Sequence, residues 1–248
     1  MITRKATHQH LAELIDPATQ TYGDWPVWKH TIAFPSSVMM GTSGTHLLET
    51  YLVVGTAWQQ VIAHYLPRAA VQGADILDIG CGCAKIARHL VADPRVGSYR
   101  GFDPMQACVE WCQRFIAPQS GERFWFEHID LYSGEYNPNG SVLADQFVFP
   151  VADHCIDIAI AASIFTHLLE ADARNYLRQS ARVLRPGGRL ILSLHTEPPD
   201  GLVYAGDEAR IDIRLDYFLR MVTECGLAVE EDLGSLCGQH ALVLTACP

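Results

Sequence analysis

The stretch Asp78-Ile79-Gly80-Cys81-Gly82-Cys83-Ala84 overlaps the end of the short apolar run Ile76–Ile79 and leads into Ala84–Ala92, which is expected to form a helix. Glycine adopts a positive φ at little steric cost and leaves the main chain bare, so a ligand can lie against it. The N-terminus of the expected helix would add free N–H groups and a partial positive charge, which suits a carboxylate. The stretch therefore predicts a ligand-binding loop between a strand and a helix.

The order of strand, turn and helix repeats on the C-terminal side of this loop. Strands are expected over residues 76–79, 99–102, 124–128, 156–162, 189–194, 227–233 and 241–245, with helices over 84–92, 104–115, 168–184 and 215–225. Strands that alternate with helices predict an α/β fold, a doubly wound and mostly parallel seven-stranded sheet with helices on both faces. Right-handed crossovers place the carboxyl ends of the parallel strands at one edge, where such sheets bind ligands.

Residues 1–72 do not show this strand–turn–helix pattern. They contain an aromatic segment broken by Pro26 and Pro35, and a helix is expected over His46–Leu66. We predict an N-terminal helical or irregular extension over 1–72 and the α/β domain over 73–248. The extension is the candidate cover for a substrate, and its helices could equally pair subunits, which leaves a homodimer open.

Composition excludes several classes of protein. The formal net charge is −10, whereas a protein that binds a nucleic-acid backbone needs a basic face. No apolar run approaches the ~18 residues of a membrane span. The first eight residues, Met1–His8, carry two positive charges without an apolar run behind them, so no secretory signal is expected and a cytoplasmic location is predicted. The eight cysteines lack paired Cys-x-x-Cys spacing, so we expect reduced thiols and no metal site.

Two cofactor classes use a glycine loop in this position. A dinucleotide site requires Gly-x-Gly-x-x-Gly, and here the third glycine is replaced by Lys85. The other pattern is an acidic residue two before the first glycine, followed by Gly-x-Gly, and Asp78 with Gly80 and Gly82 satisfies it. This stretch resembles motif I of the class I S-adenosylmethionine-dependent methyltransferases. Ala84 replaces the last glycine of that motif, and we expect a slightly tighter loop.

Further segments extend the resemblance over roughly 74–245. Asp103 follows the second strand, 23 residues past Gly80, and Asp130 follows the third. The segment Arg182–Gly188 looks like the family's turn before the fifth strand. The resemblance implies a Rossmann-like methyltransferase that binds S-adenosyl-L-methionine, with Asp103 at the ribose hydroxyls and Asp130 and Leu131 at adenine. The cofactor-binding residues that it implies are Asp78, Gly80, Cys81, Gly82, Asp103, Pro104, Asp130, Leu131 and Ser163. The alternative is that the three acids only accept hydrogen bonds from nearby main chain.

The chemistry implied is in-line transfer of a methyl group to an oxygen or nitrogen of a small molecule, which depends mainly on alignment. A hydroxyl acceptor benefits from a base, and histidine has a suitable pKa. His167 follows the fourth strand and His195 the fifth, so both are candidate catalytic bases; each could instead orient its loop.

Trp25 and Trp28 in the N-terminal segment and Tyr204 in the loop 197–212 are candidate substrate contacts, or else core residues. Three other interpretations stay open: use of the cofactor for a reaction without methyl transfer, a non-catalytic binding subunit, and, more weakly, a nicotinamide-dependent dehydrogenase.

Overall fold

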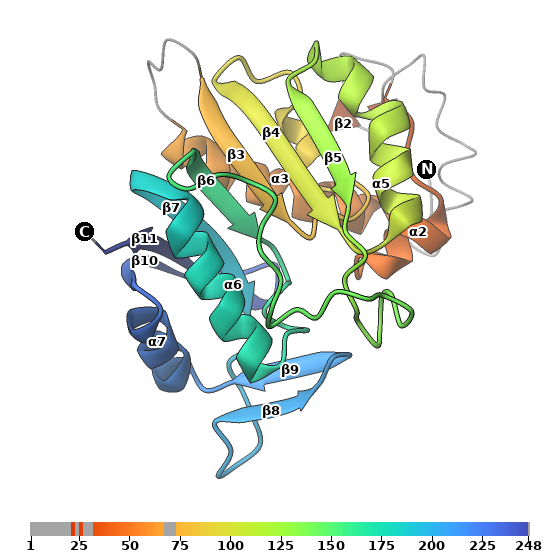
Figure 1. Cartoon of the computed structure of the whole chain (residues 1–248). Coiled ribbons are helices and arrows are strands. Elements are labelled where there is room, and N and C mark those ends of the chain that lie inside the picture. The colour runs from red at the N-terminus through yellow and green to blue at the C-terminus, as the bar shows by residue number, and fades with distance from the viewer. Residues whose placement is uncertain (1–20, 23–24, 27–31, 67–72, 248) are drawn as a thin grey trace.

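The computed structural model describes residues 21–22, 25–26, 32–66 and 73–247 (Figure 1). Seven strands form one sheet in the order β10-β11-β7-β6-β3-β4-β5. Their bounds are β3 Ala74–Ile79, β4 Val96–Asp103, β5 Phe124–His128, β6 Ile156–Ala161, β7 Leu184–Leu194, β10 Leu227–Leu236 and β11 Gln239–Ala246. Strand β11 runs antiparallel to both of its neighbours, and the other neighbouring pairs are parallel. The prediction of a mostly parallel, seven-stranded, doubly wound sheet is confirmed.

Helices cover both faces of the sheet. Their bounds are α2 Ser37–Thr42, α3 Leu48–Tyr65, α4 Ala87–Leu90, α5 Gln106–Phe115, η1 Ala117–Ser120, α6 Glu170–Val183 and α7 Leu215–Glu224. Figure 1 shows α6 lying across the face of the sheet that is turned to the viewer. Successive residues of a strand point to opposite faces. Leu77 of β3 therefore packs in one core cluster with Tyr176 of α6, whereas Ile76 packs in another with Trp58 of α3 and Cys112 of α5.

The N-terminal helices belong to this packing. Trp58 and Ile62 of α3 are buried in the cluster that contains Ile76, and Met40 of α2 packs with Cys83 and Cys108. Residues 32–66 thus contribute to the core on one face of the sheet. The domain boundary expected at residue 72 stays a prediction.

Several elements differ in extent from the expectation, and two of these differences bear on the site. The helix expected from Ala84 begins only at Ala87, because Gly82 and Ala84 take positive φ angles of 48° and 59° and keep the chain in turns. The segment 197–212, expected as a loop, contains a hairpin of two short strands, β8 Tyr204–Asp207 and β9 Arg210–Ile213.

The sheet also fixes where a ligand can enter. From β3 the chain proceeds to β4 and β5 on one side, and it then returns to β6 on the other side of β3. The loops after β3 and β6 therefore diverge and leave a crevice at the carboxyl ends of these strands.

None of the helices in the described ranges is long and apolar enough to cross a membrane.

Candidate functional site

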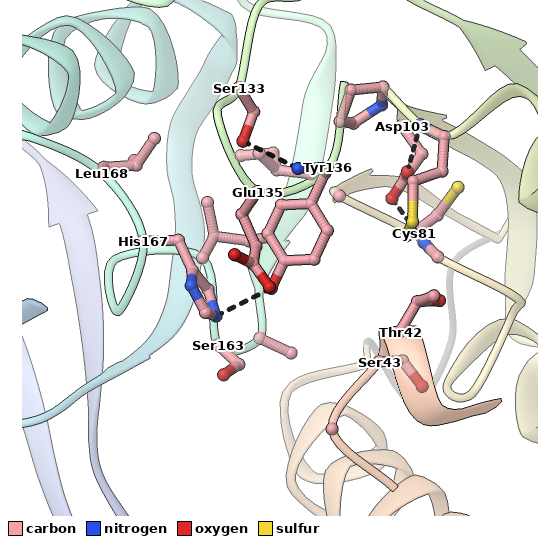
Figure 2. A pocket seen from close by; sticks show the side chains of 18 of the residues that line it. Thr42, Ser43, Cys81, Asp103, Ser133, Glu135, Tyr136, Ser163, His167 and Leu168 are labelled. Atoms are coloured by element: carbon pink, nitrogen blue, oxygen red, sulfur yellow. Dashed lines mark hydrogen bonds between the residues drawn. The ribbon is translucent and has the colours of Figure 1, made fainter. Parts of the chain in front are cut away.

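A cavity of about 950 Å³ opens at this crevice. Its walls come from the turn between α2 and α3, from α3 itself, from the loops after β3, β4, β5 and β6, and from the tips of both C-terminal hairpins. Figure 2 shows Asp103 and Cys81 on one side of the cavity, Tyr136 and His167 further across, and Ser43 at the end of α2. Small-molecule sites occupy about 300–1,000 Å³, so the cavity has room for a cofactor and a small acceptor together.

The glycine loop presents bare main chain to the cavity. Gly80 has a φ of 71°, and its N–H donates to the carbonyl oxygen of Phe102 at 2.9 Å. A Cβ atom at Gly80 would lie 2.2 Å from Cδ1 of Ile164, so a side chain at this position would enter the loop after β6. Ala84 adopts a left-handed conformation at a cost of about 1–2 kcal/mol relative to glycine. Ala84, which replaces the last glycine of the motif, therefore preserves the turn.

Asp103 joins the end of β4 to the glycine loop. Its carboxylate accepts hydrogen bonds from the N–H groups of Gly82 and Met105, each at 2.8 Å, and only 3% of the residue is exposed. Burial raises the pKa of Asp103 to about 6, although the two main-chain hydrogen bonds act to lower it. Each carboxylate oxygen has a second lone pair, so the group can also accept from a ligand hydroxyl.

Asp78 lies deeper, at the end of β3. It accepts a hydrogen bond from the hydroxyl of Tyr99, and burial raises its pKa to about 7. Asp78, Cys81, Pro104 and Leu131 all line the cavity, and their contacts with a cofactor stay a prediction.

Asp130 is exposed and lies outside the lining of this cavity. Its carboxylate accepts from the hydroxyl of Ser141 at 2.6 Å and from the side-chain amide of Asn137 at 3.3 Å, so it holds the loop after β5. Hydrogen bonds from Ser141 and Asn137 lower its pKa. The adenine contact of Asp130 stays a prediction, and Leu131 is the neighbouring residue that faces the cavity.

His167 is held between a carbonyl group and a phenol. Its Nδ1 lies 2.8 Å from the carbonyl oxygen of Glu208, and its Nε2 lies 3.1 Å from the hydroxyl of Tyr136 (Figure 2). A carbonyl can only accept, so Nδ1 carries the proton in the neutral ring, and the hydroxyl of Tyr136 donates to Nε2. Burial, together with the charges of Glu135 and Asp103, raises the pKa of Tyr136 to about 12, which keeps the phenol protonated.

Glu208 stands at the tip of the β8–β9 hairpin and also reaches the loop after β5. Its carboxylate accepts from the hydroxyl of Ser133 at 3.1 Å and from the N–H of Gly134. The same residue therefore orients His167 with its main chain and the segment leading to Tyr136 with its side chain.

Ser163 sits on a closed set of hydrogen bonds after β6. Its N–H donates to the hydroxyl of Ser193 at 2.9 Å, that hydroxyl donates to Oε1 of Gln239 at 2.6 Å, and Nε2 of Gln239 donates to the hydroxyl of Ser163 at 2.7 Å. The network supports a positive φ of 60° at Ser163. Ser193 is a polar residue within an apolar strand, and this is the sequence signal that could have revealed the hydrogen-bond network.

Two further candidates, His195 and Tyr204, lie outside the lining of the cavity. His195 follows β7 and forms an isolated main-chain β-bridge with Asp212. Burial, and to a lesser extent the positive charge of Arg210, lowers the pKa of His195. The hydroxyl of Tyr204 donates to the carbonyl oxygen of Leu168 at 2.5 Å, behind the cavity wall. Trp28 lies outside the described residues, and only the main chain of Trp25 is described. Their proposed roles stay predictions.

S-adenosylmethionine fits the residues present. The bare loop Gly80–Gly82 is open to a ligand, Asp103 can accept from ribose hydroxyls, and Leu131 offers an apolar contact at the far end. Among the described residues, no cluster of three or more histidine, cysteine, aspartate or glutamate side chains is arranged to hold a metal ion.

Comparison with known proteins finds similar methyltransferases. A family model described as a methyltransferase domain matches residues 77–192. The chain is 30% identical over 151 residues to "O-methyltransferase cnsE" of Penicillium expansum, covering 58% of this chain and 46% of that protein. It is 28% identical over 178 residues to "27-O-demethylrifamycin SV methyltransferase" of Amycolatopsis mediterranei (strain S699), covering 68% of this chain and 58% of that protein. The chain thus spans about half the length of these curated relatives.

The fold is shared with solved structures. The glycopeptide N-methyltransferase MtfA in complex with S-adenosylmethionine superposes with a TM-score of 0.57 at 14% identity, over 78% of this chain and 94% of that chain. A 1,6-didemethyltoxoflavin-N1-methyltransferase of Burkholderia thailandensis gives a TM-score of 0.54 at 17% identity, over 79% of this chain and 77% of that one. At these identities the likeness is one of fold.

Proposed function

We propose that the chain is a class I S-adenosylmethionine-dependent methyltransferase and that it methylates an oxygen or nitrogen atom of a small-molecule acceptor. The observation that carries the proposal is a single cavity with a bare glycine loop and Asp103 at one side and the Tyr136–His167 pair further across. The two curated relatives are named as methyltransferases, and one of them as acting on a demethylrifamycin.

Alignment is the main contribution of the protein. S-adenosylmethionine, when bound, would supply an electrophilic methyl group for in-line transfer to the acceptor atom, with the neutral thioether as the leaving group. The main chain of Gly80–Gly82 and the carboxylate of Asp103, which line the cavity, would hold the cofactor. Holding two reactants in line can contribute about 7–11 kcal/mol to lowering the barrier. The acids are assigned to ribose and adenine because an anion beside the sulfonium would stabilise the ground state more than the transition state.

The Tyr136–His167 pair receives the acceptor's proton. When the acceptor is a hydroxyl, Tyr136 takes its proton while the phenol proton passes to Nε2 of His167. The imidazolium formed keeps its Nδ1–H bond to the carbonyl of Glu208, so the ring stays in place. Such general-base assistance is worth about 10²–10⁴-fold in rate. A neutral amine acceptor needs this pair less.

The first experiment is calorimetric titration with S-adenosylmethionine and S-adenosylhomocysteine, followed by mass-spectrometric screening of candidate metabolites for the mass gain of one methylene group. Binding followed by methylation of an acceptor supports the proposal. Binding without a methylated product across a broad screen would favour a non-methylating reaction or a binding subunit. Absence of binding would refute the proposal. A cytoplasmic location, a homodimer and the lack of nucleic-acid partners stay predictions.

A further inference from the structure

Six acidic side chains and one lysine line the cavity among its apolar and neutral residues. The carboxylates in its wall are those of Asp78, Asp103, Glu135, Asp145, Asp172 and Glu208. Among the described residues that line it, the only lysine or arginine is Lys85. A cofactor that carries two positive groups and one carboxylate therefore meets acids at several places in the wall and a lysine at one.

Lys85 holds its ammonium group at the turn between α2 and α3. Nζ donates to the carbonyl oxygen of Ser43 at 2.5 Å, and no carboxylate of the described residues lies within ion-pair distance of it. Two N–H bonds of the ammonium group thus remain for a ligand. Burial lowers the pKa of Lys85. Lys85 is half-buried, and a cation partly withdrawn from water is stabilised when an anion pairs with it, so the site favours an anionic partner.

The main chain beside the glycine loop offers no helix N-terminus for a carboxylate, so a cationic side chain is needed to bind one. The expected helix at Ala84 would have offered its N-terminus to a carboxylate, but α4 begins at Ala87 and is only four residues long. Gly55 of α3 lets the segment approach closely, since a Cβ atom at Gly55 would lie 2.3 Å from the carbonyl oxygen of Lys85. This close packing holds Lys85 beside the glycine loop.

The order of residues along the cavity indicates which part of S-adenosylmethionine would lie at Lys85. Leu131 lies after β5, Asp103 ends β4, and the glycine loop with Lys85 follows β3, the next strand in the sheet. An extended molecule with adenine at Leu131 and ribose at Asp103 places its amino-acid part at the glycine loop. Ser43 contributes a hydroxyl there, 3.3 Å from that of Thr45.

We propose that Lys85 binds the α-carboxylate of S-adenosylmethionine, with the hydroxyls of Ser43 and Thr45 beside it. This inference rests on the proposed function, because it assigns one group of the cofactor to one side chain. It also accounts for a lysine at the position where a dinucleotide-binding loop requires its third glycine.

The test compares ligands with and without the carboxylate. Calorimetry measures the affinity of the wild-type protein and of Lys85→Met for S-adenosylmethionine and for decarboxylated S-adenosylmethionine. We expect Lys85→Met to weaken binding of the first compound by about 10–100-fold and to change binding of the second by less than about threefold. Arg100→Met, which removes an exposed cation on β4, is the matched control and should leave both affinities unchanged.

Each outcome decides between explanations. Equal loss for both compounds, or no loss for either, would overturn the inference. An effect on the KM of the acceptor alone would also overturn it, because the anion would then belong to the acceptor. If Lys85→Met fails to fold, the wild-type protein still gives the answer, since it should bind the decarboxylated compound about 10–100-fold more weakly than the intact one. Failure of the wild-type protein to bind either compound would instead count against the proposed function.

Discussion

Replacing Asp103 with asparagine separates the cofactor-binding role of this residue from its structural role. The carboxylate accepts two main-chain N–H groups at 2.8 Å, from Gly82 and Met105. An amide keeps the shape but has one oxygen, so one of these N–H groups would face an NH₂ group. Leaving a buried donor without an acceptor costs about 1–3 kcal/mol.

The loss of charge acts in the opposite direction on stability. The pKa of Asp103 rises from 3.8 to about 6 on burial, so the folded state is penalised for ionising it. This penalty is absent at pH values below the pKa of the unfolded state and complete at pH values above the pKa of the folded state. The difference between the two pKa values, about two, corresponds to a penalty of about 3 kcal/mol. Asparagine removes the penalty, which offsets the unpaired N–H group. We therefore expect the free energy of unfolding of Asp103→Asn at alkaline pH to change by less than about 2 kcal/mol.

Cofactor binding has no such compensation. A hydrogen bond to a charged group contributes about 1.5–3 kcal/mol, and two ribose hydroxyls lose a charged acceptor. The expected loss is about 3 kcal/mol or more, which is at least ~100-fold in affinity for S-adenosylhomocysteine. Calorimetry and thermal unfolding on the same samples measure both quantities, with the exposed Asp200→Asn as control. If Asp103→Asn binds within about threefold of the wild type while folding normally, the ribose assignment is wrong.

Other measurements address the remaining parts of the site. Cofactor affinity should fall as the pH drops through about 6, because Asp103 becomes protonated and loses acceptor strength; an affinity flat across this range in calorimetry would contradict the assignment. Gly80→Val should abolish binding with an unchanged far-ultraviolet circular dichroism spectrum, since its Cβ would lie 2.2 Å from Cδ1 of Ile164; retained binding would move the cofactor elsewhere. His167→Ala should lower turnover of a hydroxyl acceptor by about 10²-fold or more with cofactor affinity kept, whereas His195→Ala, outside the cavity lining, should change turnover by less than about threefold; the reverse ranking would exchange their roles.

The sheet was predictable because its strands are apolar runs between clear turns. Strand β5 spans Phe124–His128, the range expected from the sequence, and β6 ends one residue earlier than expected. The β8–β9 hairpin escaped prediction because its two strands are only four residues long and contain glycine, aspartate and arginine. The shortened α4 escaped because a helical pattern does not report the left-handed φ at Ala84.

The acids of the site were predictable for a different reason. Parallel strands end at one edge of the sheet, so residues that follow strands meet there even when they are far apart in sequence. Asp78 and Asp103 meet in this way. The orientation of His167 was not predictable, since it depends on a main-chain carbonyl of Glu208, 41 residues away, which no side-chain pattern encodes.

That carbonyl has a consequence for engineering. Every amino acid carries the same main-chain oxygen, so a library that randomises only the side chains at the tip of the β8–β9 hairpin keeps the acceptor for Nδ1 of His167. A library that alters the hairpin's length displaces this oxygen and frees the imidazole to exchange tautomers. Directed evolution should therefore tolerate point diversity at the tip far better than insertions or deletions, and hairpins grafted from relatives should be chosen for equal length before any likeness of sequence.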